Sequence, residues 1–434
     1  MPALTTFSRP LQLPELVQVP GDKSLSHRAL LLAGLATGHT QLLGLGTGQD
    51  VQATARCLQQ LGVEIKLLPT VAEVHSPGFA HWQQPEAVLD CGNSGTTMRL
   101  LLGILAAHPH IHAILDGDAS LRLRPMARVV TPLQAMGAQI QAKNGKPPLE
   151  IHGQRLRGAE HRLEVASAQV KSALLLAGLL ADGQTVVQEP LPSRDHTERL
   201  LRALGVELQT EGLTHSLTGQ GPLLQVPTLG QWQIPGDPSA AAFALVAGIL
   251  HPSGQMQVPQ VLTNPGRLGF VQVLERMGAP IARTDTQVLH GEPQATLRSH
   301  HCHLQPTDIA AAEVPSLIDE LPILALAASV ATGISHFAGI GELKVKESDR
   351  LEMIVKLLTL LGIHTEHGPD WLTIHGAGSV QNWQKLEHPW QPGLDHRMAM
   401  TAAIAGLCGP HALVVENFQQ AAQSSWPDFL LALR

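Results

Sequence analysis

Charged and hydroxyl side chains stand directly in front of Ala- and Leu-rich apolar segments at several points in this sequence. The first is PGDKSLSHR, residues 20–28, in which Lys23, Ser24 and Arg28 precede ALLLAG. The start of a helix has free amide donors and the positive end of the helix dipole, and both suit a phosphate or a carboxylate. The stretch is equally typical of a helix capped by Asp and Ser with solvated cations, so alone it leaves both interpretations open.

The first half of the chain contains further polar stretches of this kind. GNSGTTMR and ASAQVKSALLLAG each open an apolar helix, DASLRLRPMAR surrounds a Pro turn with arginines, and SRDHTERL adds an arginine and a histidine. Each could also be a capped helix start or a solvated face. The residues singled out are Gly95, Arg122, Arg124, Arg128, Ser167, Gln169, Lys171, Arg194 and His196, the last interpreted as a capping or packing residue.

The second half adds carboxylates to the cations. SLIDELPILALA places Asp319 and Glu320 immediately before an apolar helix, ELKVKESDRLEMI gathers charges at one junction, and LDHRMAMTAAIAG places Asp395, His396 and Arg397 before another helix. Paired N-terminal carboxylates are also favoured by the helix dipole alone. Because the free amides of a helix start converge where these charges stand, they are better site candidates than charges in the middle of a helix.

Together these stretches predict a cleft that binds anions and transfers protons. The seven cations named below can hold two phosphorylated substrates. Asp319 and Glu347 are the carboxylates that could transfer protons. No metal-ligand cluster, phosphate-binding GxxxxGK[ST] loop or dinucleotide fingerprint is recognisable, so we expect no cofactor and no catalytic metal. The predicted cations are Lys23, Arg28, Arg124, Arg194, Lys346, Arg350 and Arg397.

An internal repeat must position these residues. An apolar helix, a small residue, a short turn and a strand recur six times, with Gly34, Gly103, Gly178, Gly248, Ala328 and Gly406 in equivalent places. A second marker, as in LGVEI at Gly62 and MGAQI at Gly137, places a Gly where a helix should end before a strand. A purely structural solenoid is the alternative, but the copies agree only in their apolar positions.

The phrase PGDKS at the first copy returns as PGDPS, residues 235–239, without the cations. Six copies with this matched phrase predict two lobes of three units each. We expect one lobe to comprise residues 21–234 and the other residues 1–20 and 235–434, with the active site in the cleft between them.

Composition narrows the class of protein. The chain has 434 residues, 44% hydrophobic and 15% charged, and a net charge of -7. With 3% aromatic residues and no Tyr, nucleic-acid binding is disfavoured. There is no recognisable leader and no apolar stretch of membrane-spanning length, so we expect a cytoplasmic protein without membrane contact. Cys57, Cys91, Cys302 and Cys408 are interpreted as buried small residues.

The motifs, taken in order, closely resemble those of the 5-enolpyruvylshikimate-3-phosphate synthase family. The match runs from PGDKSLSHRALLLAG through GNSGTTMR, DASLRLRPM, SAQVKSALLLAG, SRDHTE, PGDPSAAAF, SLIDELPILA, ELKVKESDR and DHRMAM to SSWPDF. The resemblance implies an α/β (α+β) fold: a two-lobed inverse α/β barrel, or alpha-beta prism, in which each lobe has three βαβαββ units. It also implies that the enolpyruvyl group of phosphoenolpyruvate is transferred to the 5-hydroxyl of shikimate 3-phosphate through a tetrahedral intermediate, with release of phosphate.

The resemblance assigns a role to each matching residue. Lys23, Asp319 and Glu347 would be catalytic, with Asp319 taking the hydroxyl proton and Glu347 acting at the methylene carbon. Shikimate 3-phosphate would be held by Lys23, Ser24, Arg28, Ser167, Ala168 through its backbone, Gln169, Arg194, Asp319 and Lys346. Phosphoenolpyruvate would be held by Lys23, Gly95, Arg124, Gln169, Arg350 and Arg397.

The chain departs from one branch of that family at two positions. Ser424 stands where some members carry a Lys, and Arg194 stands where that branch carries a Tyr. Gly95 leaves room for the inhibitor glyphosate, which favours a sensitive enzyme. The alternatives are the UDP-N-acetylglucosamine enolpyruvyl transferase, which carries a Cys near the position of Arg124, and an inactive binding protein of the same fold. SLRLRPM contains no Cys, and the intact charged residues disfavour an inactive protein. We expect a monomer acting on small molecules.

Overall fold

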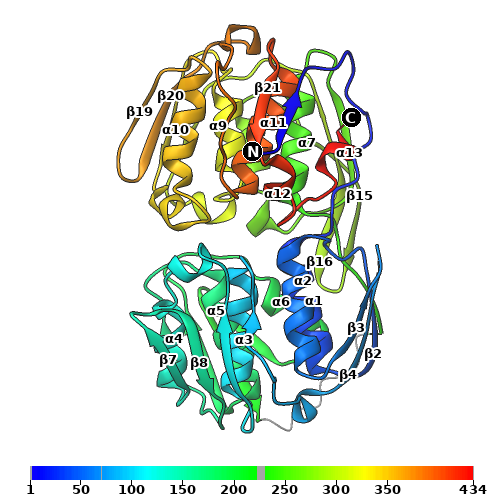
Figure 1. Ribbon diagram of the computed structural model, residues 1–434, viewed down its shortest axis with the longest axis vertical. Helices are drawn as coiled ribbons and strands as arrows, with labels where there is room; N and C mark the ends of the chain where they lie inside the picture. Colours follow the sequence, from blue (N-terminus) through cyan, green and yellow to red (C-terminus); the bar gives the residue numbers. More distant parts are fainter. Residues whose placement is uncertain (1, 70, 222–229, 434) are drawn as a thin grey trace. The chain divides into compact units, whose positions relative to one another are not determined.

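The computed structural model describes residues 2–69, 71–221 and 230–433. The chain divides into two compact units (Figure 1). Unit 1 comprises Met1–Pro20, Pro235–Val288 and Pro293–Arg434, and unit 2 comprises Gly21–Ile234 and Leu289–Glu292. The four residues 289–292 therefore group with unit 2, whereas the sequence places them in the other lobe.

Unit 2 alternates helices with short strands. Its helices are α1 (Lys23–Leu35), α2 (Gln49–Gln60), α3 (Gly95–Ala106), α4 (Ala127–Ala135), α5 (Ala168–Leu180) and α6 (His196–Ala203). Its strands are β2 (Thr37–Leu43), β3 (Glu64–Leu67), β4 (Val71–Pro77), β5 (Leu89–Asp90), β6 (His112–Asp116), β7 (Gln139–Lys143), β8 (Lys146–His152), β9 (Glu160–Arg162), β10 (Asp182–Gln188), β11 (Leu208–Glu211), β12 (Thr214–Gln220) and β13 (Gly230–Gln233).

Unit 1 is built in the same manner. Its helices are α7 (Pro238–Leu250), α8 (Gly269–Arg276), α9 (Leu321–Ala328), α10 (Arg350–Leu360), α11 (His396–Cys408), α12 (Phe418–Ala422) and α13 (Phe429–Ala432). Its strands are β1 (Leu4–Phe7), β14 (Gln255–Leu262), β15 (Ala282–Leu289), β16 (Glu292–His300), β17 (Asp308–Ile309), β18 (Ile334–Ala338), β19 (Thr365–His367), β20 (Trp371–His375) and β21 (Leu413–Glu416), although the tip of the β15–β16 hairpin groups with unit 2.

Three of the four-stranded sheets in the described chain share one topology. In the order β5-β6-β8-β7 the first two strands are parallel, and the remaining neighbours are antiparallel. The orders β9-β10-β12-β11 and β17-β18-β20-β19 repeat this pattern. A helix connects each parallel pair, because parallel neighbours need a crossover connection, and a hairpin ends each repeat. These three repeats are βαβαββ units.

Within each unit, segments distant in sequence pair with one another next to the points where the chain passes from one unit to the other. β13, which precedes α7, pairs in parallel with β2 of unit 2. Leu16, which precedes α1, forms a parallel bridge with Gln257 of β14 in unit 1. The N-terminal strand β1 pairs with β21, near the other end of the chain. The phrases PGDKS and PGDPS therefore each follow a segment that pairs with a strand distant in sequence.

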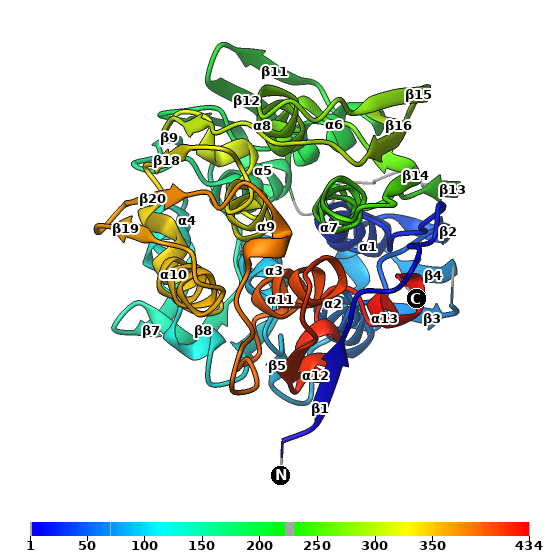
Figure 2. The same ribbon diagram turned by 90° about the horizontal axis from the view of Figure 1, so that it is seen from above.

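The first helix of each repeat is buried and lies close to its neighbours. All thirteen residues of α7 and of α11 are buried, and α7, α9 and α11 lie together in the middle of unit 1 (Figure 2). In unit 2, α3 contacts both α1 and α5. A Cβ on Gly103 would lie 2.4 Å from the carbonyl oxygen of Ala173 on α5, so the small residue of the repeat is needed for this approach.

The second glycine marker is confirmed as the residue that ends the outer helices. These glycines follow α2, α4, α6, α8 and α10 and have positive φ, for example 88° at Gly62 and 100° at Gly137. In this left-handed conformation a residue with a side chain would be strained. The marker therefore fixes where each outer helix stops and the following strand or hairpin begins.

The structure also tests what the sequence indicated about the cysteines and about membrane-spanning segments. Cys57, Cys91 and Cys408 are buried as expected, but Cys302 is partly exposed, because it follows the end of β16. None of the helices in the described part of the chain combines the length and the apolar character that crossing a membrane requires.

Candidate active site

The start of α1 is organised by Asp22 and Arg28. Asp22 caps the helix by accepting a hydrogen bond from the Leu25 amide at 2.8 Å. Lys23, in the first turn, lies 3.2 Å from the carboxylate of Asp50 on α2. Both the capping and the ligand-binding interpretations of PGDKS are therefore compatible with the structure, because the residue that caps the helix is Asp22 and not one of the cations.

Arg28 is held in a fixed position within unit 2. Its guanidinium donates to Thr197 Oγ1 at 2.8 Å, to Ser172 Oγ at 2.7 Å and to the Ser24 carbonyl at 2.9 Å. The pKa of Arg28 is lowered to about 10, mainly by burial; the charges of Glu198 and Asp22 oppose this shift, and the charge of Arg194 contributes to it. A buried cation near a second cation, fixed mainly by neutral partners, is a favourable place for an anion.

The starts of α3 and α5 form a second polar cluster. Gln169 in the first turn of α5 accepts a hydrogen bond from Arg99 at 2.6 Å and donates to Thr96 Oγ1 at 2.9 Å. Arg124 donates to the side chain of Asn93 at 2.5 Å. A Cβ on Gly95 would lie 2.6 Å from Arg99 Nη1 and 3.3 Å from Arg124 Nη1, so this glycine lies beside two guanidinium groups.

A chain of buried hydroxyl groups connects the starts of α1 and α3. His27 Nδ1 lies 2.7 Å from Thr54 Oγ1, Thr54 lies 2.7 Å from Thr97 Oγ1, and Thr97 donates to Ser94 Oγ at 2.7 Å. Burial, followed by the charges of Lys23 and Arg28, lowers the pKa of His27 well below its usual value, so its imidazole is neutral. Because Ser172 on α5 also contacts Arg28, the starts of α1, α3 and α5 converge.

The other residues predicted in unit 2 lie at the same helix starts. Ser167 caps α5 by accepting from the Val170 amide at 3.4 Å, which leaves Ala168 as the first helical residue. Arg194 lies in the loop before α6, and its charge contributes to the lowered pKa of Arg28. Ser24, in the first turn of α1, is partly buried.

At the second copy of the phrase, PGDPS, other buried side chains bind to the residues at the start of α7. Asp237 caps α7 through the Ser239 amide at 2.8 Å, and Arg267 lies 3.2 Å from the Asp237 carboxylate. Arg267 also donates to Ser239 Oγ at 3.1 Å, and Ser239 donates to Glu320. All four residues are buried, so this helix start is a structural junction rather than an open cation site.

Arg350 is the centre of the charged cluster in unit 1. It is 1% exposed and donates to Glu347 at 2.6 Å and to Asp395 at 2.8 Å, and it lies 3.5 Å from Asp319 Oδ1. Burial alone would lower the pKa of Arg350, but these carboxylates, Asp395 foremost, raise it above its usual value. The two predicted proton-transfer carboxylates thus share one permanently charged neighbour.

Arg397 approaches Asp319 from the start of α11. Its Nη1 donates to the Asp319 carbonyl at 2.9 Å, and its Nε lies 3.7 Å from Asp319 Oδ1. Asp319 lies in the turn before α9, and Lys346 follows the short 3₁₀ helix Gly341–Val345. Asp319, Glu347, Arg350 and Arg397 are therefore gathered in unit 1, as the sequence predicts for this half of the chain.

Some residues of these clusters were not predicted from the sequence. Arg99 and Asp50, which the sequence did not indicate, contact the predicted residues Gln169 and Lys23. Asp395, which the sequence does place before this helix, contacts Arg350 and caps α11 through the Arg397 amide at 3.0 Å. Asp395 carries a recognisable helix-cap signal, whereas Arg99 lies inside the helical pattern. By contrast Arg122, which the sequence also singles out, forms an exposed ion pair with Asp116.

A buried ionic cluster supports Arg28 from within unit 2. Lys171 Nζ lies 2.6 Å from Glu189 Oε2 and 2.6 Å from Glu198 Oε1, and His215 Nε2 lies 3.2 Å from Glu189. Burial would raise the pKa of Glu189, but a hydrogen bond with His215 and the charge of Lys171 hold it below its usual value. Lys171 directly precedes Ser172, and Glu198 directly follows Thr197; these are the two hydroxyl residues that accept hydrogen bonds from Arg28.

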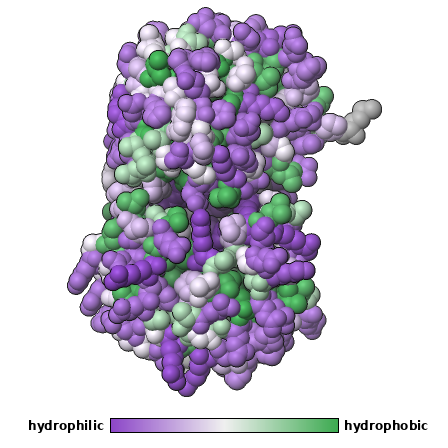
Figure 3. Space-filling view, turned by 90° about the vertical axis from the view of Figure 1, so that its left-hand side faces the viewer, coloured by the Kyte–Doolittle hydropathy of each residue, from purple (hydrophilic) through white to green (hydrophobic). Residues whose placement is uncertain are grey.

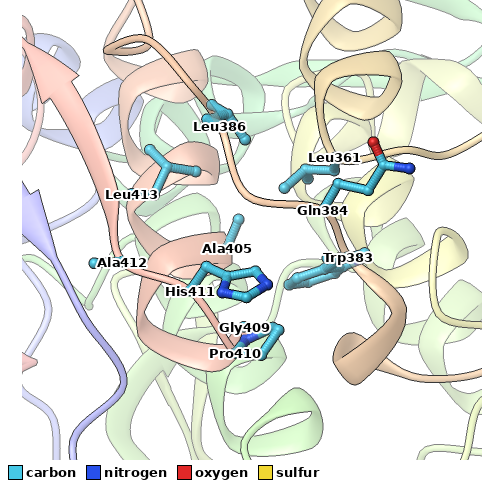
Figure 4. A pocket seen from close by; sticks show the side chains of 10 residues that line it. All are labelled: Leu361, Trp383, Gln384, Leu386, Ala405, Gly409, Pro410, His411, Ala412 and Leu413. Carbon is cyan, nitrogen blue, oxygen red and sulfur yellow. The ribbon is translucent and has the colours of Figure 1, made fainter.

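One apolar crevice lies away from all the predicted residues. Figure 4 shows its lining, which comes from α10, α11 and the segments around them in unit 1. Its volume of about 10 Å³ has room for roughly one water molecule. It is lined by Leu361, Trp383, Gln384, Leu386, Ala405, Gly409, Pro410, His411, Ala412 and Leu413, none of which is a predicted site residue.

Comparison with known proteins identifies the relatives of this chain. A sequence profile of EPSP synthase (3-phosphoshikimate 1-carboxyvinyltransferase) matches residues 9–433. The chain belongs to the EPSP synthase family. A 3-phosphoshikimate 1-carboxyvinyltransferase of Desulfitobacterium hafniense is 45% identical over 416 residues, which cover 95% of this chain and 93% of the relative. One of Thermus thermophilus is 44% identical over 418 residues, which cover 95% and 94%.

Solved structures agree with this membership. EPSP synthase from Acinetobacter baumannii matches with a TM-score of 0.85 and 36% identity, over 98% of this chain and 96% of that one. The enolpyruvyl transferase NikO from Streptomyces tendae has the same fold, with a TM-score of 0.77 at 17% identity over 100% and 96% of the two chains. The predicted α/β fold of the EPSP synthase family and the predicted enzyme class, a transferase, are confirmed.

Proposed function

We propose that this chain transfers the enolpyruvyl group of phosphoenolpyruvate to the 5-hydroxyl of shikimate 3-phosphate and releases phosphate. The hydroxyl oxygen bonds to C2 of phosphoenolpyruvate while its proton leaves and C3 gains a proton, which gives a tetrahedral intermediate. C3 then loses a proton as the bond from C2 to the phosphate oxygen breaks. Atoms and charge balance without an oxidant, a reductant or a metal ion.

The helix starts of unit 2 support binding of two anionic substrates. Arg28 and Arg194 form a cationic pair beside the start of α1, which suits the phosphate of shikimate 3-phosphate. We assign Lys23, Ser24, Ser167, Ala168, Gln169, Asp319 and Lys346 to the same substrate. Gly95 lies beside the guanidinium groups of Arg99 and Arg124, which suits the small phosphoenolpyruvate with its two anionic groups, a carboxylate and a phosphate.

The cluster of unit 1 supports acid–base chemistry. We assign Asp319 as the acceptor of the 5-hydroxyl proton and Glu347 as the acid and base at C3, with Lys23 assisting. Arg350 contacts both carboxylates, and this is the observation that carries the proposal. Together with Arg397 it stabilises the negative charge of Asp319 and would bind the carboxylate or phosphate of phosphoenolpyruvate.

We expect replacement of Gly95 by Ala to raise the KM for phosphoenolpyruvate by roughly 10-fold to 10²-fold. The new Cβ would meet Arg99 Nη1 at 2.6 Å and Arg124 Nη1 at 3.3 Å, so both guanidinium groups must move, while no backbone atom is displaced. Steady-state kinetics measure the effect, and the KM for shikimate 3-phosphate serves as an internal control. An unchanged KM for phosphoenolpyruvate would remove Gly95 from the proposed site.

The function itself is tested by phosphate release. With shikimate 3-phosphate and phosphoenolpyruvate we expect phosphate and one equivalent of the enol ether product, and with UDP-N-acetylglucosamine as acceptor we expect neither. Phosphate release with the nucleotide sugar alone would assign the chain to the alternative transferase. No release with either acceptor would favour a binding protein that has kept the fold.

A further inference from the structure

Groups of histidine and acidic side chains with closely spaced ligand atoms occur at three places in the described residues. The ligand atoms of each group lie within 4.8 Å of one another. Two groups lie in unit 2, and their charges already have partners. Lys171 lies between Glu189 and Glu198, and Asp195 pairs with Arg199 at 2.8 Å beside the buried pair of His196 and Glu292.

The third group differs because it faces solvent and contains no cation other than imidazole. It comprises His364, Glu366 and His375 in unit 1, whose side chains are 69%, 57% and 33% exposed. Strands β19 and β20 lie at the left of Figure 1, and Figure 3 views the molecule from that side, where the surface of this unit is mostly hydrophilic.

The strand register brings the three side chains to one face. The amide of His375 donates to the carbonyl of His364 at 3.0 Å, so the two histidines are cross-strand neighbours, and their ring centroids are 4.5 Å apart. Glu366 follows His364 by two residues, which returns it to the same face of the strand. Sheet geometry thus presents two imidazoles and one carboxylate together.

The spacing of the ligand atoms suits a small divalent ion. Glu366 Oε1 lies 3.0 Å from His375 Nε2 and 3.8 Å from His364 Nε2. Ligands bound about 2.0–2.1 Å from a tetrahedral zinc ion are about 3.3 Å apart, which lies between these two distances. Adjustments of a few tenths of an ångström in exposed side chains would suffice.

We propose that His364, Glu366 and His375 form a surface site for a divalent transition-metal ion, with Zn²⁺ the best match. Imidazole nitrogen selects zinc, copper or nickel over magnesium and calcium, which prefer oxygen ligands. Glu366 also lines an open hollow of about 500 Å³ with Trp371 and His336, so solvent can supply the remaining ligands. The proposal is independent of the proposed reaction, since these residues are not part of the candidate active site.

The chain offers a matched control in another repeat. His112 on β6 and His152 on β8 are also cross-strand neighbours, with ring centroids 4.5 Å apart and Glu150 3.2 Å from His152. That trio is not among the groups whose three ligand atoms converge within 4.8 Å in the described chain. It therefore has the composition of the site without its geometry.

The test is zinc titration of the tag-free, full-length protein by isothermal titration calorimetry in a non-chelating buffer. We expect one equivalent of Zn²⁺ to bind, and we expect the affinity to fall roughly tenfold or more in the His364→Ala/His375→Ala double variant and in Glu366→Gln. The His112→Ala/His152→Ala variant should bind Zn²⁺ as the unaltered protein does. Circular dichroism checks that each variant folds.

Cobalt provides a second readout, because a four-coordinate Co²⁺ site with nitrogen and oxygen ligands absorbs visible light far more strongly than the hydrated ion. We expect this absorption in the unaltered protein and its loss in the His364→Ala/His375→Ala variant. Absence of Zn²⁺ binding, or equal binding by all variants, would overturn the proposal. Equal losses in both double variants would also contradict it, since they would indicate diffuse binding to surface histidines.

Discussion

Replacement of Asp319 by Asn is expected to lower kcat by about 10²–10⁴-fold while the protein remains folded. Asn has nearly the same shape but cannot accept the hydroxyl proton as a carboxylate does. The backbone carbonyl at this position still accepts the hydrogen bond from Arg397, and Arg350 keeps Glu347 and Asp395 as partners. Phosphate release under saturating substrates measures the effect.

The same substitution at Asp308 serves as the control for Asp319→Asn. Asp308 is an exposed carboxylate on β17 of the same unit, and its replacement should leave kcat unchanged. Near-normal turnover of the Asp319 variant would refute its assignment as the proton acceptor. Loss of the circular dichroism spectrum would instead indicate a structural role for the carboxylate.

Replacement of Lys171 by Met is expected to lower the free energy of unfolding by about 3–5 kcal/mol. Lys171 is the ammonium partner of two carboxylates in a cluster whose ion-pair side chains are at most 8% exposed, and Met fills a similar volume without charge. Glu189 and Glu198 would then repel each other in a region of low polarity. Urea unfolding followed by circular dichroism measures the loss.

Removing the charge of the carboxylates should restore much of that stability. In the Lys171→Met/Glu189→Gln/Glu198→Gln variant no uncompensated carboxylate stays buried in the cluster, so we expect it to be more stable than Lys171→Met alone. Lys143→Met, at an exposed position of the same unit, should change the unfolding free energy by less than about 0.5 kcal/mol. Equal stability of Lys171→Met and the unaltered protein would mean that the cluster contributes no net energy.

Features set by neighbouring residues in the chain could be predicted from the sequence. The glycine after each outer helix marks a left-handed residue, and an Asp or Ser before an apolar run marks a helix start, as at Asp22 and Asp395. Asp319 and Glu347 lie beside Arg350, and each stands close to the start of a helix.

Features set by pairing between distant segments could not be predicted in the same way. Arg99 reads as one polar residue in an apolar helix, and only the approach of α5 shows that its guanidinium meets Gln169. The Lys171 cluster likewise joins α5, α6, β12 and the end of β10, and no local spacing relates them. The grouping of residues 289–292 with unit 2 depends on where a hairpin ends in space.

The pairing of the N-terminal segment with strands that are made much later has a consequence for folding during synthesis. The amide of Ala3 bonds to the side chain of Asn417, which leaves the ribosome 414 residues later. Unit 2 has its strands in one continuous segment and can fold as it emerges, whereas β1 and Leu16 pair with β21 and β14 of unit 1, which are made later. The segment before unit 2 is thus synthesised ahead of that unit but pairs only after it, once β14 and β21 have been made.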